Sequence, residues 1–319
     1  MSELLMIAIL ILGGLVLLYF GADWLVKGAV TISLKFGLSP LIVGLTVVAL
    51  GTSLPEALVS IQATLDNQGG IALGNVIGSN ILNIALILGL SSLLQPLKVD
   101  SHLVKADVPI LVGASFLLIV LLEDFHISRM EGALLLLGIV FYVTGNIMTV
   151  KRTSPAEDQI EGMEVPGDPS KHLLRDIGFL ILGLIALALG SNFLVEGAVD
   201  LARIWGLSEA LIGLTIVSIG TGTPELATAL MAAYRKTADI AIGNAVGSNI
   251  FNIFFVVGLA GLIAPINGTQ ISPSDLYVMF GLTFLLLPTV WTGMVLDRKE
   301  GFLFVAIYVA YIYYLWTTI

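Results

Sequence analysis

Two glutamates, Glu56 and Glu225, each end a polar stretch inside sequence that is otherwise apolar enough to cross a membrane. The first stretch is 51–56, with the sequence GTSLPE, and the second is 220–225, with the sequence GTGTPE. An ionisable side chain inside a membrane span is costly, and by default it indicates a functional site. Because the two stretches are related copies, we expect the two carboxylates to serve one site.

Each glutamate is followed at the same distance by a second polar motif, GNVIGSNILN at 74–83 and GNAVGSNIFN at 243–252. The side chains of the two motifs, in both copies, supply only oxygen ligands, and the backbone carbonyls freed by proline add further oxygens. These ligands are the carboxylates of Glu56 and Glu225, the hydroxyls of Thr52, Ser53, Thr221, Thr223, Ser79 and Ser248, and the amides of Asn83 and Asn252. Such a set suits Ca²⁺, Na⁺, Mg²⁺ or Mn²⁺ and argues against Zn²⁺ or Cu⁺.

A divalent cation explains why two acidic side chains are placed in the membrane. Desolvation disfavours the charge of a buried carboxylate, and two carboxylates brought together also repel each other. The other explanation is a buried acid paired with a basic residue, but the only Lys or Arg within a predicted span is Arg175, at the very start of the sixth. Ca²⁺ tolerates irregular geometry and loses its water more readily than Mg²⁺, so it fits a dry cage of protein oxygens better.

Several polar and small residues in these motifs also have structural explanations. Ser and Thr in a span often bond to the preceding helical turn. The spacing of Gly74 and Gly78, and of Gly243 and Gly247, is typical of close helix packing. Asn80 and Asn249 can bond across helices without contacting a ligand. Both readings therefore remain open for the hydroxyls and these amides.

Composition places the chain in a membrane. Of its 319 residues 57% are hydrophobic and 12% are charged, against about 25% charged in soluble domains. There is no cysteine, which excludes a disulfide framework and a thiolate metal site. The net charge of −9 leaves no basic patch for nucleic acid. We expect a multi-pass protein of the cell membrane, monomeric in the lipid bilayer, with no organic cofactor.

Ten apolar runs are long enough to cross a bilayer as helices. They are 4–26, 40–65, 70–96, 106–122, 131–150, 174–200, 207–234, 238–264, 275–294 and 300–318. Twelve of the 14 Lys and Arg residues lie in loops that follow odd-numbered spans. Positive residues favour the cytoplasmic side, so we expect these loops in the cytoplasm and both termini outside.

The chain repeats itself at an offset of 169 residues. Between 37–89 and 206–258 about 23 of about 53 aligned pairs are identical. Residues 1–150 and 174–319 form the two five-span repeats, joined by a polar cytoplasmic linker at 151–173. Because five is odd, the repeats cross the membrane in opposite directions. Inverted repeats of broken helices are typical of secondary transporters, and Pro55 and Pro224 predict the breaks near the midplane.

The duplicated motifs closely resemble the α-repeats of the cation/calcium antiporter superfamily, in its prokaryotic sodium/calcium exchanger branch. The resemblance covers both halves and implies four cation sites between the second, third, seventh and eighth spans. It implies that Glu56 and Glu225 hold Ca²⁺ together with the carbonyls of Thr52 and Thr221. The implied sodium ligands are the carbonyls of Ala49 and Ser218 with Thr52, Ser79, Thr221 and Ser248, while Asn83 lines the middle site. The first and sixth spans would slide as a gating pair.

Two positions depart from the family pattern. Gly222 stands where the family usually has a serine, so one sodium site loses a hydroxyl unless Thr223 or water replaces it. Relatives also often carry aspartate in place of Asn252. The proton/calcium branch has a different motif around its glutamate, which this chain lacks. Sodium is thus the favoured counter-ion, and the number of sodium ions per cycle is left open.

The sequence therefore predicts a secondary antiporter that exchanges Ca²⁺ for Na⁺ by alternating access, with no enzymatic activity. The alternative within this class is H⁺/Ca²⁺ exchange, since coupled carboxylates also bind protons. Other divalent cations such as Mn²⁺, and K⁺, remain candidate cargo. A cation channel with the two glutamates at a constriction is the alternative from another class.

Overall fold

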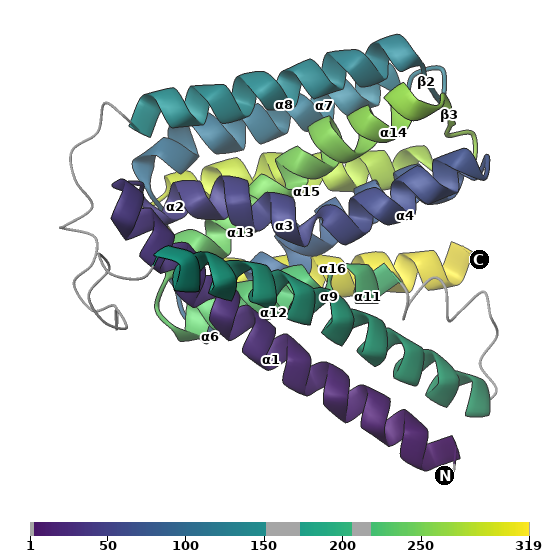
Figure 1. The fold of residues 1–319 in the computed structure, drawn as a ribbon. Helices are drawn as coiled ribbons and strands as arrows, with labels where there is room; N and C mark the ends of the chain where they lie inside the picture. The colour runs from purple at the N-terminus through teal and green to yellow at the C-terminus, as the bar shows by residue number, and fades with distance from the viewer. Residues whose placement is uncertain (1–2, 151–172, 206–217, 319) are drawn as a thin grey trace.

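The first repeat is a series of helices, several of them interrupted by π-helical turns (Figure 1). The computed structural model describes residues 3–150, 173–205 and 218–318. The helices of the first repeat are α1 (Glu3–Phe36), α2 (Pro40–Val43), η1 (Gly44–Val48), α3 (Ala49–Thr52), α4 (Leu54–Leu65), α5 (Gly69–Ile81), η2 (Leu82–Leu88), α6 (Gly89–Leu94), η3 (Leu103–Asp107), α7 (Val108–Leu121) and α8 (Arg129–Val150).

The second repeat contains counterparts of most of these helices. Its helices are α9 (Leu173–Ile204), α11 (Ser218–Thr221), α12 (Thr223–Tyr234), α13 (Ala238–Phe251), η6 (Asn252–Val257), α14 (Gly258–Ile263), α15 (Pro273–Trp291) and α16 (Arg298–Thr318). Eight described helices are long and apolar enough to span a membrane, and a bent pair, Pro40–Thr52 with Leu54–Leu65, makes a ninth. The remaining predicted span, the seventh at 207–234, begins outside the described residues, and nearly all of the predicted linker at 151–173 lies outside them.

The all-α membrane fold of two inverted repeats is confirmed, but the first and sixth spans were predicted too short. Helix α1 reaches Phe36 instead of residue 26, and α9 reaches Ile204 instead of residue 200. Lys27 does not stop α1, because its ammonium group pairs with Asp23 one turn earlier at 2.7 Å. The helix ends instead at Gly37, whose φ of +63° favours glycine.

Four two-residue strands, which the sequence analysis did not predict, join the repeats at their loops. Strand β1 (Leu97–Lys98) pairs with β4 (Val295–Leu296), and β2 (His126–Ile127) pairs with β3 (Ile266–Asn267). The first pair joins the loops after spans three and nine, and the second joins those after spans four and eight. Paired loops must lie on one side of the membrane, so both pairs agree with the predicted alternation of spans.

Helices α1 and α9 pack against each other along their length and lie side by side in Figure 1. Their backbones approach closely because glycines line the contact. A Cβ added to Gly14 would lie 2.7 Å from the Leu194 nitrogen and 2.8 Å from the Gly190 carbonyl oxygen. Real Cβ atoms do not approach backbone this closely, so no side chain fits between the two helices at this point. The two helices form a pair that is distinct from the helices around Glu56 and Glu225.

The second span is broken where the sequence predicts it. Helix α3 ends at Thr52, α4 begins at Leu54, and the two axes differ by 42°. The residue between them, Ser53, has φ −81° and ψ 2°, and its counterpart Gly222 has nearly the same values, −84° and 4°. Pro55 lies in the first turn of α4 and cannot donate the hydrogen bond that would continue α3.

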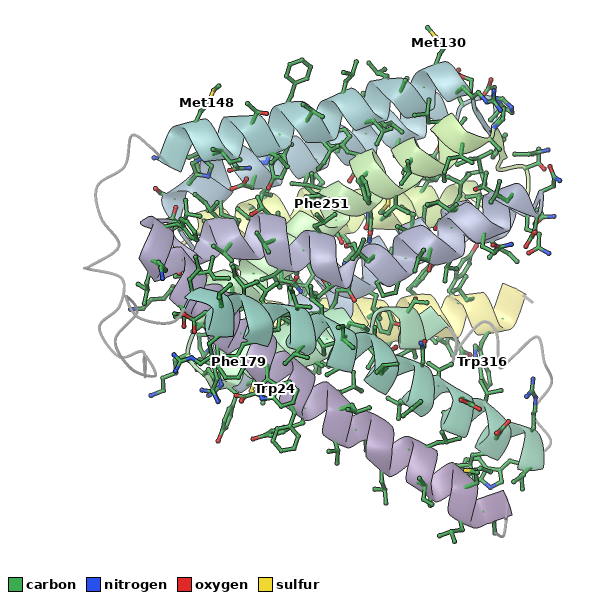
Figure 2. The ribbon with its side chains drawn as sticks, viewed as in Figure 1. Trp24, Met130, Met148, Phe179, Phe251 and Trp316 are labelled. Atoms are coloured by element: carbon green, nitrogen blue, oxygen red, sulfur yellow. The ribbon has the colours of Figure 1, made fainter. Side chains whose placement is uncertain are left out.

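The outer surface is apolar, as a lipid-facing surface must be. Met130, Met148 and Trp316 extend outward in Figure 2 and are exposed, whereas Phe251 lies in the interior. Exposed apolar side chains occur along nearly all of the long helices. Many of the buried polar side chains lie instead at the two breaks and in the helices facing them.

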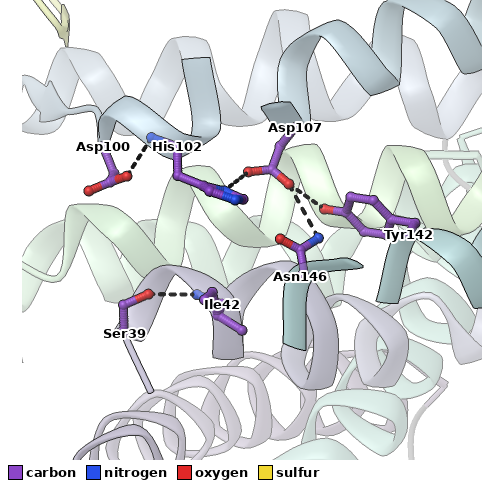
Figure 3. Close-up of polar contacts among 7 residues, drawn as sticks. All are labelled: Ser39, Ile42, Asp100, His102, Asp107, Tyr142 and Asn146. Carbon is purple, nitrogen blue, oxygen red and sulfur yellow. Dashed lines mark hydrogen bonds and ion pairs between the residues drawn. The ribbon is translucent and has the colours of Figure 1, made fainter. Parts of the chain in front are cut away.

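A separate polar cluster ties α7 and η3 to the end of α8 (Figure 3). Asp107 is fully buried, and its Oδ1 accepts hydrogen bonds from Tyr142 Oη at 3.0 Å and Asn146 Nδ2 at 3.4 Å. Its Oδ2 lies 3.0 Å from His102 Nδ1. The His102 backbone N–H donates to Asp100 Oδ1 at 2.6 Å. Asp107 thus fixes the fourth span against the fifth.

Removing the His102 ring should change the pH dependence of stability. The hydrogen bond to Asp107 raises the pKa of His102 above its usual 6.5, with the charge of Asp107 and then that of Asp100 adding to it. This stabilisation is complete below the unfolded pKa and is lost as the pH rises through the folded pKa. We expect the melting temperature of the wild type in detergent to fall as the pH rises above 6.5. The melting temperature of His102→Gln should not show this fall. Identical pH profiles for the two proteins would contradict the ion pair.

Candidate cation site

Hydrogen bonds between the repeats bring the polar residues of four spans together. The Thr52 hydroxyl lies 3.1 Å from Asn244 Oδ1 and 3.3 Å from Ser248 Oγ, both on α13. In the other direction, the Thr221 hydroxyl lies 3.5 Å from Asn75 Oδ1 on α5. Helix α3 of the broken second span therefore contacts α13, and α11 of the broken seventh span contacts α5. The sequence alone could predict the members of this site, but not these contacts.

Four asparagines form a symmetric layer where α5 and α13 cross. Asn80 Nδ2 donates to the Asn249 carbonyl at 3.4 Å, and Asn249 Nδ2 donates to the Asn80 carbonyl at 3.1 Å. Asn83 Nδ2 donates to Asn249 Oδ1 at 2.9 Å, and Asn252 Nδ2 donates to Asn80 Oδ1 at 3.1 Å. Asn80 and Asn249 thus make the cross-helix bonds that the sequence allowed. The oxygens Oδ1 of Asn83 and Asn252 are buried and accept no hydrogen bond.

Glu56 and Glu225 lie at the centre of this arrangement without a partner. Glu56 is fully buried and Glu225 nearly so, and none of their four carboxylate oxygens accepts a hydrogen bond. No described basic residue pairs with either. The Glu225 carboxylate lies close enough to Glu56 for their charges to interact. An uncompensated buried charge costs several kcal/mol, so this pair of carboxylates calls for a cation.

Two asparagines that the sequence analysis quoted but did not assign turn out to position the site. Asn244 accepts from Thr52, while Asn75 lies beside Thr221 and donates to the Glu56 carbonyl at 3.1 Å. Asn75 also donates to Ser60 Oγ at 3.0 Å. Asn75 and Asn244 occupy the same position in the two copies of the motif that also contains Ser79 and Ser248. This recurrence could have identified them from the sequence.

The remaining predicted ligands lie at or beside the same centre. Ser79 and Ser248 are buried on α5 and α13, and Ala49 is buried in α3. The Ala49 carbonyl accepts the Ser53 N–H at 3.0 Å, and the Thr52 hydroxyl also lies 3.4 Å from it. Ser218 begins α11. The glycine spacing on α13 is close packing as well, because a Cβ on Gly247 would lie 2.7 Å from the Leu45 carbonyl oxygen.

The two halves differ at the break itself. Ser53 Oγ is buried and has no hydrogen-bond partner. Its counterpart is Gly222, which has no hydroxyl, and the next residue, Thr223, donates its hydroxyl hydrogen to the Ile219 carbonyl at 3.0 Å. A Cβ on Gly222 would lie only 2.2 Å from Leu82 Cδ2. This atom is the end of a flexible side chain, so a serine at 222 would require Leu82 to shift.

A cavity of about 270 Å³ adjoins the break in the second span. It lies between the α3–α4 break and α9, and Pro224 of the seventh span also lines it. Leu184 and Ala188 of α9 form its far wall, and Thr52 forms part of the near wall. The cavity therefore extends from the close-packed α1–α9 pair to a residue of the polar centre.

The chemistry of the centre suits cation binding with few formal charges. Besides the two carboxylates, the centre contains neutral hydroxyl, amide and carbonyl oxygens. No group of three or more His, Cys, Asp or Glu side chains that could hold a metal ion occurs within 3–150, 173–205 and 218–318. A cation here would be held by the two glutamates and by neutral oxygens, a pattern that permits binding and release.

Comparisons with known proteins agree with this geometry. The chain matches the family model described as sodium/calcium exchanger protein over residues 6–148 and 176–317. It is 38% identical to the putative antiporter CaxA of Alkalimonas amylolytica, over 99% of this chain and 100% of that protein. It is 33% identical to the sodium/calcium exchanger MaX1 of Methanosarcina acetivorans, over 95% of this chain and 97% of that protein.

A solved structure shows the same fold over nearly the whole length. The sodium-calcium exchanger NCX_Mj, soaked with Na⁺ and Sr²⁺, superposes with a TM-score of 0.85 at 32% identity, covering 97% of this chain and 98% of that one. The family match spans both repeats and includes both glutamates. The chain therefore belongs to the sodium/calcium exchanger protein family.

Proposed function

We propose that this protein is a secondary antiporter that exchanges Ca²⁺ for Na⁺ between Glu56 and Glu225. The observation that carries this proposal is the pair of buried carboxylates, one from each inverted repeat, with no protein partner for any of their oxygens. The sodium/calcium exchanger named among the relatives and NCX_Mj support the choice of ions.

The ligands we assign to the transported cations are those at the centre. They are Glu56, Glu225, Thr52, Thr221, Ser53, Ser79, Ser248, Asn83 and Asn252, with the carbonyls of Ala49 and Ser218. Ca²⁺ and Na⁺ compete for these oxygens, since either load neutralises the same two carboxylates. Without a load the carboxylates repel each other in a medium of low dielectric constant. The empty site therefore resists movement, which enforces exchange over leak.

Access alternates, in this proposal, by movement of α1 and α9 past the helices that hold the site. No side chain separates the two helices at Gly14, and the cavity beside Leu184 extends from α9 to Thr52. The excess of Lys and Arg in loops after odd spans supports cytoplasmic odd loops and external termini. The linker at 151–173 would then be cytoplasmic, and each monomer would hold a complete site.

Uptake of Ca²⁺ into proteoliposomes tests this function when one ion gradient is imposed at a time. An outward Na⁺ gradient should drive ⁴⁵Ca²⁺ accumulation, whereas equal K⁺ or H⁺ gradients should not. The physical reason is that the driving ion must bind the same oxygens as Ca²⁺ and be released on the other side. Accumulation driven by a pH jump in sodium-free vesicles would instead assign the protein to H⁺/Ca²⁺ exchange. Flux without any counter-ion would indicate a channel.

A further inference from the structure

An ion pair joins α1 to a helix of the cation site. Asp23 of α1 pairs through Oδ1 with Arg235, which follows α12 directly, and through Oδ2 with Lys27 at 2.7 Å. The Asp23 side chain is only 10% exposed, so solvent and salt screen its ion pairs weakly. The first turn of α12 carries Glu225. The Asp23–Arg235 pair therefore fixes α1 to the helix that supplies one of the two carboxylates.

The contact between α1 and α12 is closely packed. It lies on the cytoplasmic side in the orientation proposed above, because Arg235 follows the seventh span. Helix α1 packs against α12 there, and Leu25 and Ala29, which follow Asp23 along α1, are fully buried. The structure is thus closed between these two helices.

The inverted repeat places the equivalent contact, between α9 and α4, on the outer side, and there the packing is loose. The cavity of about 270 Å³ lies between these helices, lined by the first turn of α4 and by Leu184 of α9. Leu194 and Ala198 of α9 are the counterparts of Leu25 and Ala29 at the repeat offset, and both are partly exposed. The two repeats therefore differ in whether this contact is made.

The residues at the outer contact cannot form the same ion pair. Asn192 of α9 stands where α1 has Asp23, and Asp66 follows α4 where Arg235 follows α12. An amide and a carboxylate form no ion pair, and Glu196, one turn after Asn192, brings a charge of the same sign as Asp66. Asn192, Glu196 and Asp66 are all exposed. Closing the outer contact therefore gains less than closing the cytoplasmic one.

We propose that the Asp23–Arg235 ion pair holds the cytoplasmic side of the cation site closed, so that the protein without a load rests with its site open to the outside. This inference rests on the proposed function and specifies which state of its cycle is favoured. Asp23 and Arg235 are positioning residues, since neither is among the ligands assigned to the cations. Opening the cytoplasmic side separates this pair, whereas opening the outer side separates no equivalent pair.

Labelling of a single introduced cysteine tests the proposal, because the chain has none of its own. Val30 lies seven residues after Asp23, on the same face of α1, and is buried. In inverted membrane vesicles without Na⁺ or Ca²⁺, Val30→Cys should react slowly with a membrane-impermeant maleimide. Adding Asp23→Asn or Arg235→Gln should speed the labelling about tenfold, because losing a partly buried ion pair shifts a two-state equilibrium toward the open state.

Two substitutions in the same background are matched controls. Lys27→Gln removes the cation that pairs with Asp23 within α1 and leaves the pair to α12. Arg235→Lys keeps a positive charge beside Asp23. Both should label as slowly as Val30→Cys alone. Fast labelling of Arg235→Lys would show that the volume of the arginine, and not its charge, closes the contact.

The outer contact offers a test that leaves Asp23 and Arg235 intact. Asn192→Asp with Asp66→Arg supplies the missing ion pair between α9 and α4. This double variant should favour closure of the outer side and speed labelling at Val30→Cys. Asn192→Asp alone places two like charges there, and its labelling should stay slow. Equal labelling of these two variants would overturn the proposed asymmetry.

Transport distinguishes a shifted equilibrium from a damaged protein. In Arg235→Gln the KM for cytoplasmic Ca²⁺ should fall by up to about tenfold while the KM for external Ca²⁺ rises, because the competent fraction changes in opposite directions on the two sides. Unchanged labelling in both Asp23→Asn and Arg235→Gln overturns the role of the ion pair and leaves the antiporter assignment intact. Wild-type vesicles without Na⁺-dependent Ca²⁺ flux overturn the proposed function, and this inference with it.

Discussion

Glu56→Gln and Glu225→Gln should each lower Na⁺-driven Ca²⁺ uptake by about 100-fold or more. Glutamine has the size of glutamate, but it removes one of the two charges that hold the cation and replaces one oxygen by an amide group. Because the carboxylates have no protein partner, neither substitution breaks an existing hydrogen bond. The loss should therefore be confined to cation binding.

Thermal unfolding of the purified variants separates this result from misfolding. Without cations, each variant should be at least as stable as the wild type, because it carries one buried charge fewer. Ca²⁺ at about 100 times its Kd should stabilise the wild type by about 2.7 kcal/mol and the variants much less. Asp275→Asn is a control at a second acid of a membrane helix, since Asp275 is half-buried in the first turn of α15 and accepts a hydrogen bond from Tyr311 Oη at 2.9 Å. Wild-type uptake by both glutamine variants would disprove the site.

Gly14→Leu should lower the rate of Ca²⁺ exchange by at least about tenfold. It should do so by disturbing the contact between α1 and α9, and not by weakening cation binding. A Cβ at residue 14 already meets backbone atoms of Leu194 and Gly190 at 2.7 and 2.8 Å. Backbone cannot move aside as a side-chain end can, so a leucine must push α1 and α9 apart. Overpacking of this kind typically costs about 1–3 kcal/mol, and here it acts on the surface along which we propose that the helices move.

The neighbouring residue provides the control for this substitution. A Cβ on Gly13 meets nothing within 4 Å, so Gly13→Leu adds the same group to the same helix without a clash. We expect Gly13→Leu to exchange ions at the wild-type rate. Gly14→Leu should still show stabilisation by Ca²⁺, because the site residues lie on other helices. Equal exchange rates for the two variants would show that the close α1–α9 contact is not needed for transport.

The sequence predicted the fold class and the members of the site because both depend on local chemistry. Spans follow from the length of apolar runs, and breaks follow from Pro55 and Pro224, which cannot donate a backbone hydrogen bond. The inverted arrangement follows from the repeat offset and an odd number of spans. The absence of a basic partner for the glutamates could also be predicted, since no Lys or Arg falls within the predicted spans except Arg175 at the start of the sixth.

The contacts across the repeats could not be predicted in this way. Nothing local indicates that Thr52 faces Asn244, or that Asn83 bonds to Asn249 and leaves its own oxygen free. These pairs depend on the angle at which α5 and α13 cross, which is a result of packing over the whole molecule. The extra turns of α1 were missed for a different, local reason, because Lys27 pairs with Asp23 one turn earlier and does not end the helix.

The sequence alone thus determined that this is a ten-span protein of two inverted repeats with two carboxylates in the membrane. It also showed that Gly222 lacks the hydroxyl of Ser53, but it left open whether Thr223 replaces it. Only the tertiary structure shows where these groups lie, with Thr223 Oγ1 donating to the Ile219 carbonyl and Leu82 packed against Gly222. The physical reason is that a sequence names the groups that can bind a cation, whereas the space left for that cation depends on side chains distant in the chain.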